Sequence, residues 1–100
     1  MNFHANLREE IMALIAWDYR NQLTVILNTA RHSGKPYIDV ESGNLHNRVR
    51  GKQNANHKIA VCCDVMRRMM RPGDSILMEP ANGDGTDLTI RYILKGNYEH

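Results

Sequence analysis

Two cysteines and two histidines are the side chains best suited to hold a metal ion: Cys62, Cys63, His46 and His57. A zinc site needs ligands that converge on one point, and its cysteines are commonly spaced as CxxC. Cys62 and Cys63 are adjacent, and adjacent residues of a helix point about 100° apart. We therefore expect no metal and no cofactor, and we predict one buried cysteine beside a partly exposed one.

A catalytic nucleophile would need a histidine and an orienting carboxylate beside it. Cys63, His46 and Asp39 are present, but no glycine-flanked nucleophile elbow accompanies them. Gly83 and Gly85 are not followed by the Lys-Ser or Lys-Thr and the helix that a phosphate-binding loop requires. The sequence predicts no enzyme activity and no catalytic residue.

Residues 54–71 combine an apolar stripe with a concentration of positive charge. Their apolar side chains recur every three or four residues, which predicts a helix with one buried face. These side chains are Ile59, Cys62 or Cys63, Met66, and Met69 or Met70. The other faces carry Lys58 and three arginines against a single acid, Asp64. Such a helix can bury one side and present the other to a polyanion.

The net charge of +2 is distributed unevenly along the chain. Between Arg31 and Arg71, nine lysines or arginines face three acids, a balance of +6, and the rest of the chain has a balance of −4. A basic middle between acidic ends is typical of a polyanion-binding element on a neutral scaffold. The hydrophobic fraction of 42% and the charged fraction of 24% are those of one folded domain.

The elements that must position the basic helix begin with an N-terminal helical pattern. Asn6 and Glu9 have the spacing of a capping box, and Leu7, Ile11, Leu14 and Ile15 form a stripe at helical spacing. The stripe weakens at residues 18–22 and then resumes as far as Ser33-Gly34, where glycine can end a helix. We predict two helices with a break near residues 18–22.

A short strand over residues 37–40 follows, and then a helix that Ser42 caps and Gly51 ends. A short polar connection leads into the basic helix, so the two helices form a helix-turn-helix. Pro72-Gly73 stops the second helix. Residues 75–80 and 87–94 alternate as strands around the turn residues 82–86, which predicts an antiparallel hairpin. We also expect Met66, Met69, Met70 and Met78 to fill the core.

The order helix, short strand, helix, turn, basic helix, strand, glycine-rich turn and strand resembles a winged helix-turn-helix domain. The resemblance is one of architecture, and it implies an α+β fold with a C-terminal β-hairpin wing. Residues 1–22 would be an added N-terminal helix, residues 23–94 the winged-helix core, and residues 95–100 a frayed tail.

Within that core, the resemblance implies a positioning helix at 42–50, a recognition helix at 57–70 and a wing tip at 82–86. The tip carries Asp84 and nearby Asp87 but no Lys or Arg, unlike wings that enter a minor groove. DNA contact from this side of the domain would therefore fall to Arg91 on the following strand.

The function implied is that of a double-stranded DNA-binding protein, a small transcriptional regulator that reads the major groove with the basic helix 56–70. Side chains at the start of that helix lie nearest the base edges. They are Asn54, Asn56, His57 and Lys58. Phosphate contacts are expected from Arg48, Arg50, Lys52, Arg67, Arg68, Arg71 and Arg91.

Two other functions fit the same residues. One is a winged-helix scaffold for protein–protein interaction, which the acidic wing favours. The other is an accessory or specificity module of a nucleic-acid enzyme, such as a restriction or defence system, whose catalytic residues lie on another chain.

Trp17 and Tyr19 stand where the first helical pattern weakens, as a partner surface or as a lid on the core. We predict a homodimer through this N-terminal helix.

The longest apolar window, residues 11–17, is too short to span a bilayer and follows two glutamates. The adjacent cysteines cannot form an ordinary structural disulfide, which agrees with a reducing compartment. We expect a cytoplasmic protein without membrane contact.

Overall fold

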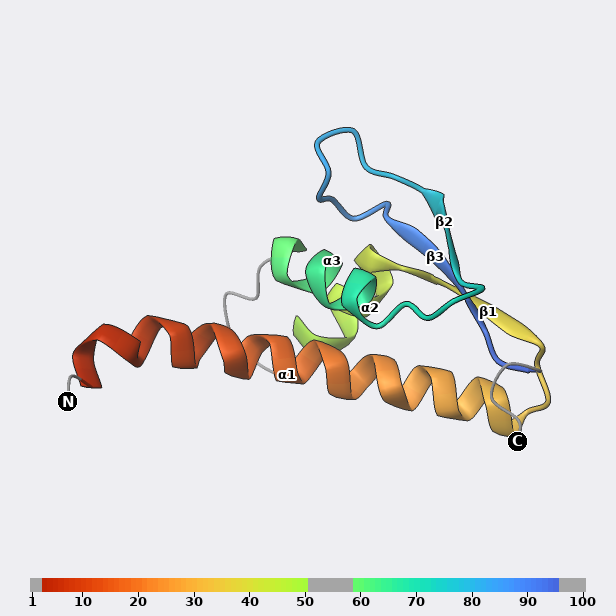
Figure 1. Cartoon of the computed structure of the whole chain (residues 1–100), viewed down its shortest axis with the longest axis horizontal. Helices are drawn as coiled ribbons and strands as arrows, with labels where there is room; N and C mark the ends of the chain where they lie inside the picture. Colours follow the sequence, from red (N-terminus) through yellow and green to blue (C-terminus); the bar gives the residue numbers. More distant parts are fainter. Residues whose placement is uncertain (1–2, 51–58, 96–100) are drawn as a thin grey trace.

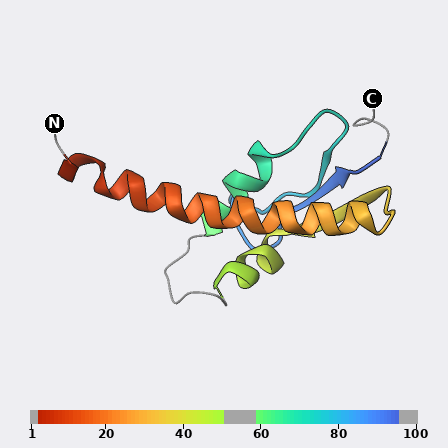
Figure 2. The ribbon, with the colours of Figure 1, turned by 90° about the horizontal axis from the view of Figure 1, so that it is seen from below.

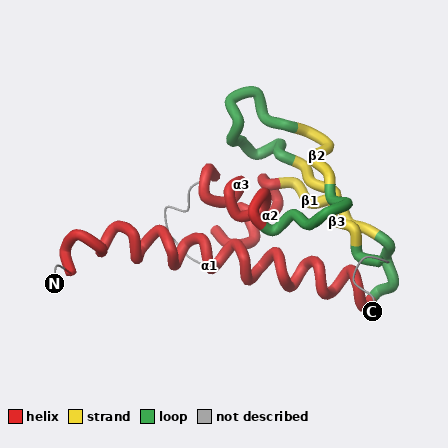
Figure 3. Tube along the Cα trace, in the orientation of Figure 1, coloured by secondary structure: helices red, strands yellow, loops and turns green. Residues whose placement is uncertain are grey.

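The computed structural model describes residues 3–50 and 59–95, which form an α+β fold of helices packed on a small antiparallel sheet (Figures 1 and 3). The described elements follow the order α1 (Phe3–His32), β1 (Tyr37–Glu41), α2 (Ser42–Arg50), α3 (Ile59–Arg68), β2 (Ser75–Met78) and β3 (Thr89–Ile93). In Figure 1, α2 and α3 lie against the middle of the long α1, and the sheet extends from them. The predicted α+β class is confirmed.

Helix α1 is continuous over 30 residues, so the prediction of a break at residues 18–22 is wrong. The boundary expected between residues 22 and 23 lies inside this helix. The stretch contains neither Gly nor Pro, and a polar surface alone does not end a helix. Tyr19 and Leu23, both completely buried, attach this part of α1 to the core.

The two ends of α1 differ in how well the sequence placed them. The helix begins at Phe3, before the predicted cap at Asn6. It ends as predicted, because Gly34 adopts a φ of 84° and its amide donates a 3.0 Å hydrogen bond to the carbonyl of Arg31.

Helix α1 carries apolar side chains on two opposite sides. Leu14 and Leu23 are nine residues apart, which places them about 180° apart around a helix. Leu23 is fully buried, whereas Leu14 is 65% exposed. Leu7 and Ile11 are also exposed. The N-terminal part of α1 extends past the other described elements in both views (Figures 1 and 2). Leu7, Ile11 and Leu14 of the stripe expected at the start of this helix are therefore exposed, whereas its fourth member, Ile15, is partly buried and packs against the core.

The sheet has the strand order β1-β3-β2, and both pairings are antiparallel. Asp39 lies opposite Arg91, and Ile76 lies opposite Ile90. The predicted hairpin is thus confirmed, with shorter strands and a ten-residue connection over residues 79–88. Met78, expected in the core, is 52% exposed, because β2 pairs with β3 but has no described helix packed closely against it, and all four of its residues are exposed.

The core forms where α1, α2, α3 and the inner face of β3 meet. Its fully buried members include Leu45 from α2, Met66 from α3 and Ile90 from β3. The hydroxyl of Tyr92 donates a 2.9 Å hydrogen bond to the carbonyl of Met66, which ties β3 to the last turn of α3. The apolar stripe predicted for the basic helix is therefore the face that packs on the core. The described helix ends at Arg68, and residues 54–58 of the prediction lie outside the described residues.

Candidate nucleic-acid interface

The start of α2 is joined to the 79–88 loop by a group of hydrogen bonds that we call the α2–loop junction. The amides of Ser42 and Gly43 donate to the carbonyls of Leu88 and Thr86 at 2.8 and 2.9 Å. The Ser42 hydroxyl, predicted as a local helix cap, donates to the carbonyl of Gly85, 43 residues away. Ser42 is completely buried, so this bond replaces water that the hydroxyl has lost.

Both cysteines complete the α2–loop junction from α3. The Sγ of Cys63 donates to the carbonyl of Gly85 at 3.3 Å, and the Sγ of Cys62 to the carbonyl of Ser42 at 3.6 Å. Both are fully buried, so the prediction of a partly exposed cysteine is wrong. Burial, and then the neighbouring Cys63, raise the pKa of Cys62 to about 12. A thiol held neutral in this way is a poor nucleophile and a poor metal ligand.

The three residues weighed as a nucleophilic set lie in different contacts. Cys63 donates to Gly85, the His46 ring stacks on Tyr19 with centroids 6.2 Å apart, and Asp39 binds Arg91 on the sheet. Across residues 3–50 and 59–95, no group of three or more His, Cys, Asp or Glu side chains could hold a metal ion. The structure therefore brings no nucleophile, base and carboxylate together among these three.

Arg67, one of the predicted phosphate contacts, is bound to the loop that follows β2. Its guanidinium donates to Glu79 at 3.0 Å, to Asp84 at 3.1 Å and to the carbonyl of Gly83. The hydrogen bond to Glu79, followed by that to Asp84, raises the pKa of Arg67. The side chain is 30% exposed, and exposed ion pairs of this kind contribute about 1 kcal/mol or less each. Arg67 acts as a clamp between α3 and this loop.

Among the other predicted phosphate contacts, Arg48, Arg68 and Arg71 are exposed at the surface. Arg68 is 73% exposed and pairs with Asp64 one turn earlier at 2.8 Å. Arg48 donates to the side-chain oxygen of Gln22 on α1 at 3.2 Å. Arg71 is exposed just after α3, and Arg50 is the last residue of α2.

Arg91 lies on β3 and makes a two-pronged bond to Asp39 on β1, at 2.8 and 3.0 Å. Its guanidinium carbon also lies 4.1 Å from the centre of the Tyr37 ring. The hydrogen bond from Arg91 lowers the pKa of Asp39. Arg91 therefore joins the two paired strands on the exposed face of the sheet.

The predicted base contacts Asn54, Asn56, His57 and Lys58, and the predicted phosphate contact Lys52, lie outside the described residues. Where the structure is described, the C-terminal side of α3 is not basic. Three arginines face five carboxylates over residues 59–89, a balance of −2. Residues 31–58 contribute +4 and residues 59–71 contribute +2 to the balance of the chain's middle, and the four carboxylates of residues 74–87 make the longer segment acidic.

The two aromatic residues of the predicted partner surface differ in exposure. Tyr19 is completely buried and belongs to the core, so its assignment to a partner surface is wrong. Trp17 is 56% exposed and borders an open apolar hollow with Ala13 and Leu14.

None of the described helices is both long enough and apolar enough to cross a membrane.

Sequence reasoning missed Ser42, Gly43 and Gly85 as a structural unit. Its signal was slight: a Ser-Gly pair directly after a strand, and a glycine-rich loop far along the chain.

No family model matches this chain, and no curated protein or solved structure matches it significantly.

Proposed function

We propose that this chain is a winged helix-turn-helix domain that binds double-stranded DNA. The observation that carries the proposal is the order of the elements together with the sheet order β1-β3-β2. The loop of the β2–β3 hairpin is bound to the start of α2 through Ser42 and to α3 through Arg67, and these contacts support our assignment of the hairpin as the wing. The positive balance of +6 between Arg31 and Arg71 adds an electrostatic reason.

The contacts of the arginines divide their roles in this proposal. Arg67 and Arg91 are engaged with carboxylates of their own domain, so we assign them to structure. Arg68 keeps a phosphate role. Its exposed pair with Asp64, one helical turn away, is worth only about 0.5 kcal/mol, so Arg68 can leave Asp64 for a phosphate. Arg48, Arg50, Lys52 and Arg71 complete the phosphate set. The base contacts remain Asn54, Asn56, His57 and Lys58.

A fluorescence anisotropy titration of a labelled duplex at several salt concentrations tests the proposal. Arg48→Gln should weaken binding to every duplex and reduce the salt slope by about one, since one phosphate contact is lost. Arg67→Gln is the matched control and should leave the slope unchanged. Asn56→Ala should cost about 1–3 kcal/mol at one base pair and little on scrambled DNA. Equal slopes for the wild type and Arg48→Gln would refute the assignment.

The exposed stripe on α1 supports a homodimer as part of this proposal. Leu7, Ile11, Leu14 and Trp17 are each about half exposed or more. A two-fold axis would place the same apolar stripe of a second copy against it, which removes both from water. Leu14→Asp should convert a sedimenting dimer to a monomer and leave the circular dichroism spectrum unchanged. A monomeric wild type at micromolar concentration would contradict the dimer.

A protein-interaction scaffold is the second candidate, favoured by the acidic loop. Arg67 is bound to Glu79 and Asp84, and the balance over residues 59–89 is negative. Such a surface repels a polyanion and suits a basic partner protein. Absence of duplex binding at low salt, in a folded sample, would select this function over DNA binding.

A further inference from the structure

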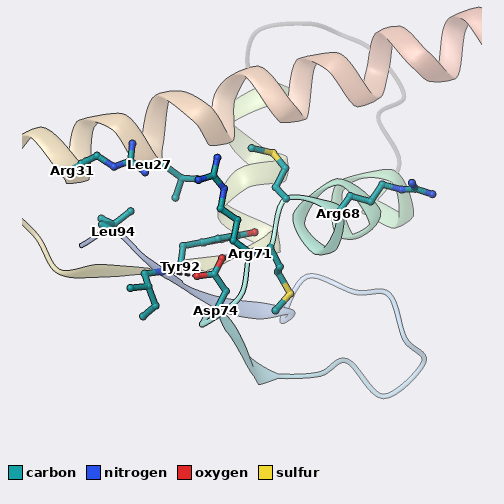
Figure 4. Close-up of a pocket in the computed structure, with 10 residues that line it drawn as sticks. Leu27, Arg31, Arg68, Arg71, Asp74, Tyr92 and Leu94 are labelled. Atoms are coloured by element: carbon teal, nitrogen blue, oxygen red, sulfur yellow. Dashed lines mark hydrogen bonds between the residues drawn. The ribbon is translucent and has the colours of Figure 1, made fainter. Parts of the chain in front are cut away.

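A cavity of about 290 Å³ lies where the C-terminal half of α1, the turn after α3 and the end of β3 meet (Figure 4). Its apolar wall includes Leu27, Met70, Tyr92 and Leu94. Tyr92 and Leu94 are almost completely buried, so the wall is continuous with the core. The cavity is near the lower end of the range for small-molecule sites, about 300–1,000 Å³.

Two arginines from distant parts of the chain border this apolar wall. In Figure 4, the Arg71 side chain rises from the turn after α3 toward α1, and Arg31 extends from α1 toward the same opening. Arg68 also lines the cavity, but its side chain points away from Leu27 and pairs with Asp64. Arg31 and Arg71 therefore supply the positive charge at the opening.

The position of each arginine is set by hydrogen bonds. Arg31 donates from Nη1 to the side-chain oxygen of Asn28 at 2.8 Å. Asp74 accepts the backbone amides of Arg71 and Ile93, each at 2.8 Å, which holds the turn after α3 against β3. Asp74, the carboxylate among the lining residues, thus accepts one backbone amide with each of its two oxygens, and each oxygen can accept a further donor. A guanidinium has five N–H donors, so it can bind a protein acceptor and an anion together.

We propose that this cavity binds a small organic carboxylate, with its apolar body against Tyr92 and Leu94 and its carboxylate between Arg31 and Arg71. The apolar wall favours a ligand with an apolar part. The two guanidiniums favour a planar carboxylate, because a guanidinium offers parallel N–H donors. A neutral analogue would lose these charged bonds, and inorganic phosphate would lose the apolar contact. The site shares Arg71 with the proposed phosphate contacts, but Arg31 and the apolar wall belong to it alone and it is tested with a probe of its own, so either proposal can fail alone.

The test uses 2-naphthoate as the probe, titrated into the ¹⁵N-labelled full chain and followed by amide chemical shifts. Saturable shifts should appear at the amides of residues 27–31, 69–71, 73–74 and 92–94. The neutral 2-naphthamide and inorganic phosphate should each bind about tenfold more weakly or worse, as expected when a charged bond or the apolar contact is lost.

Matched variants separate this site from general charge effects. Arg31→Gln and Arg71→Gln should each weaken the binding of 2-naphthoate about tenfold. Arg71→Lys should weaken it less than Arg71→Gln does, because lysine keeps the positive charge. Arg20→Gln, at an exposed arginine of α1 outside the cavity, should have no effect. Equal binding of the acid and the amide, shifts confined to Ala13, Leu14 and Trp17, or no saturable shift at millimolar probe would each overturn the proposal.

Discussion

The amide of Gly43 donates a 2.9 Å hydrogen bond to the carbonyl oxygen of Thr86, and this short approach leaves no room for a side chain at residue 43. A Cβ atom there would lie 2.9 Å from that oxygen and 3.1 Å from the Cβ of Thr86. The first of these neighbours is backbone, which cannot rotate away. Glycine at this position therefore lets the 79–88 loop lie against the start of α2.

Gly43→Ala should destabilise the protein by about 1–3 kcal/mol, the usual cost of overpacking, despite the higher helix propensity of alanine. Urea unfolding followed by circular dichroism measures the change. Asn44→Ala is the control, because Asn44 is exposed in the same turn of α2. A Gly43→Ala protein as stable as the wild type would show that the loop does not occupy this position.

Two leucines on opposite sides of α1 should respond differently to truncation. Leu23→Ala removes a completely buried side chain and should cost about 2–5 kcal/mol in the free energy of unfolding. Leu14→Ala removes a 65% exposed side chain and should change the unfolding of the monomer by less than about 0.5 kcal/mol. Chemical unfolding of dilute samples gives both values. A large loss from Leu14→Ala under those conditions would mean that this stripe packs within the monomer.

The two cysteines should resist thiol reagents in the folded protein. Both are completely buried, which keeps the reagent from either sulfur, and the pKa of Cys62 is raised to about 12, so little Cys62 thiolate exists near pH 8. With an aromatic disulfide reagent, the folded chain should react only as fast as it opens, and both thiols should react at once in urea. Rapid reaction of one thiol without denaturant would contradict this burial.

The Asp39–Arg91 pair predicts a pH dependence of stability. The folded pKa of Asp39 is lowered, chiefly by its hydrogen bond with Arg91, below the unfolded value of about 3.9. The pair therefore stabilises the fold above that unfolded value, and its contribution disappears as the pH falls through the lowered folded value. Asp39→Asn should reduce the free energy of unfolding at pH 7 more than at about pH 2. Glu9→Gln is the control for an exposed acid, and an equal loss at both pH values would count against the pair.

Local patterns in the sequence determined much of this fold. Period-two alternation located β1, β2 and β3, and the spacing of Ile59, Cys62 and Met66 identified the buried face of α3. Gly34 marked the end of α1. These features could be read from the chain because each depends on neighbours a few residues away, whose spacing records which face is buried.

Other features were decided only by the tertiary structure. The polar stretch at residues 18–22 stays helical because Tyr19 and Leu23 are buried against other elements, which no local pattern reveals. Arg67 could have been a phosphate contact by sequence, but its carboxylate partners lie 12 and 17 residues further along the chain.

The α2–loop junction depends most on the folded chain. Ser42 and Gly85 are 43 residues apart, and neither carries a local signal for the other. Their hydrogen bond exists because β3 pairs with β1 and returns the loop to the start of α2. Charge and periodicity were set by the sequence alone, whereas the partner of each buried polar group was set by which distant segments the sheet brought together.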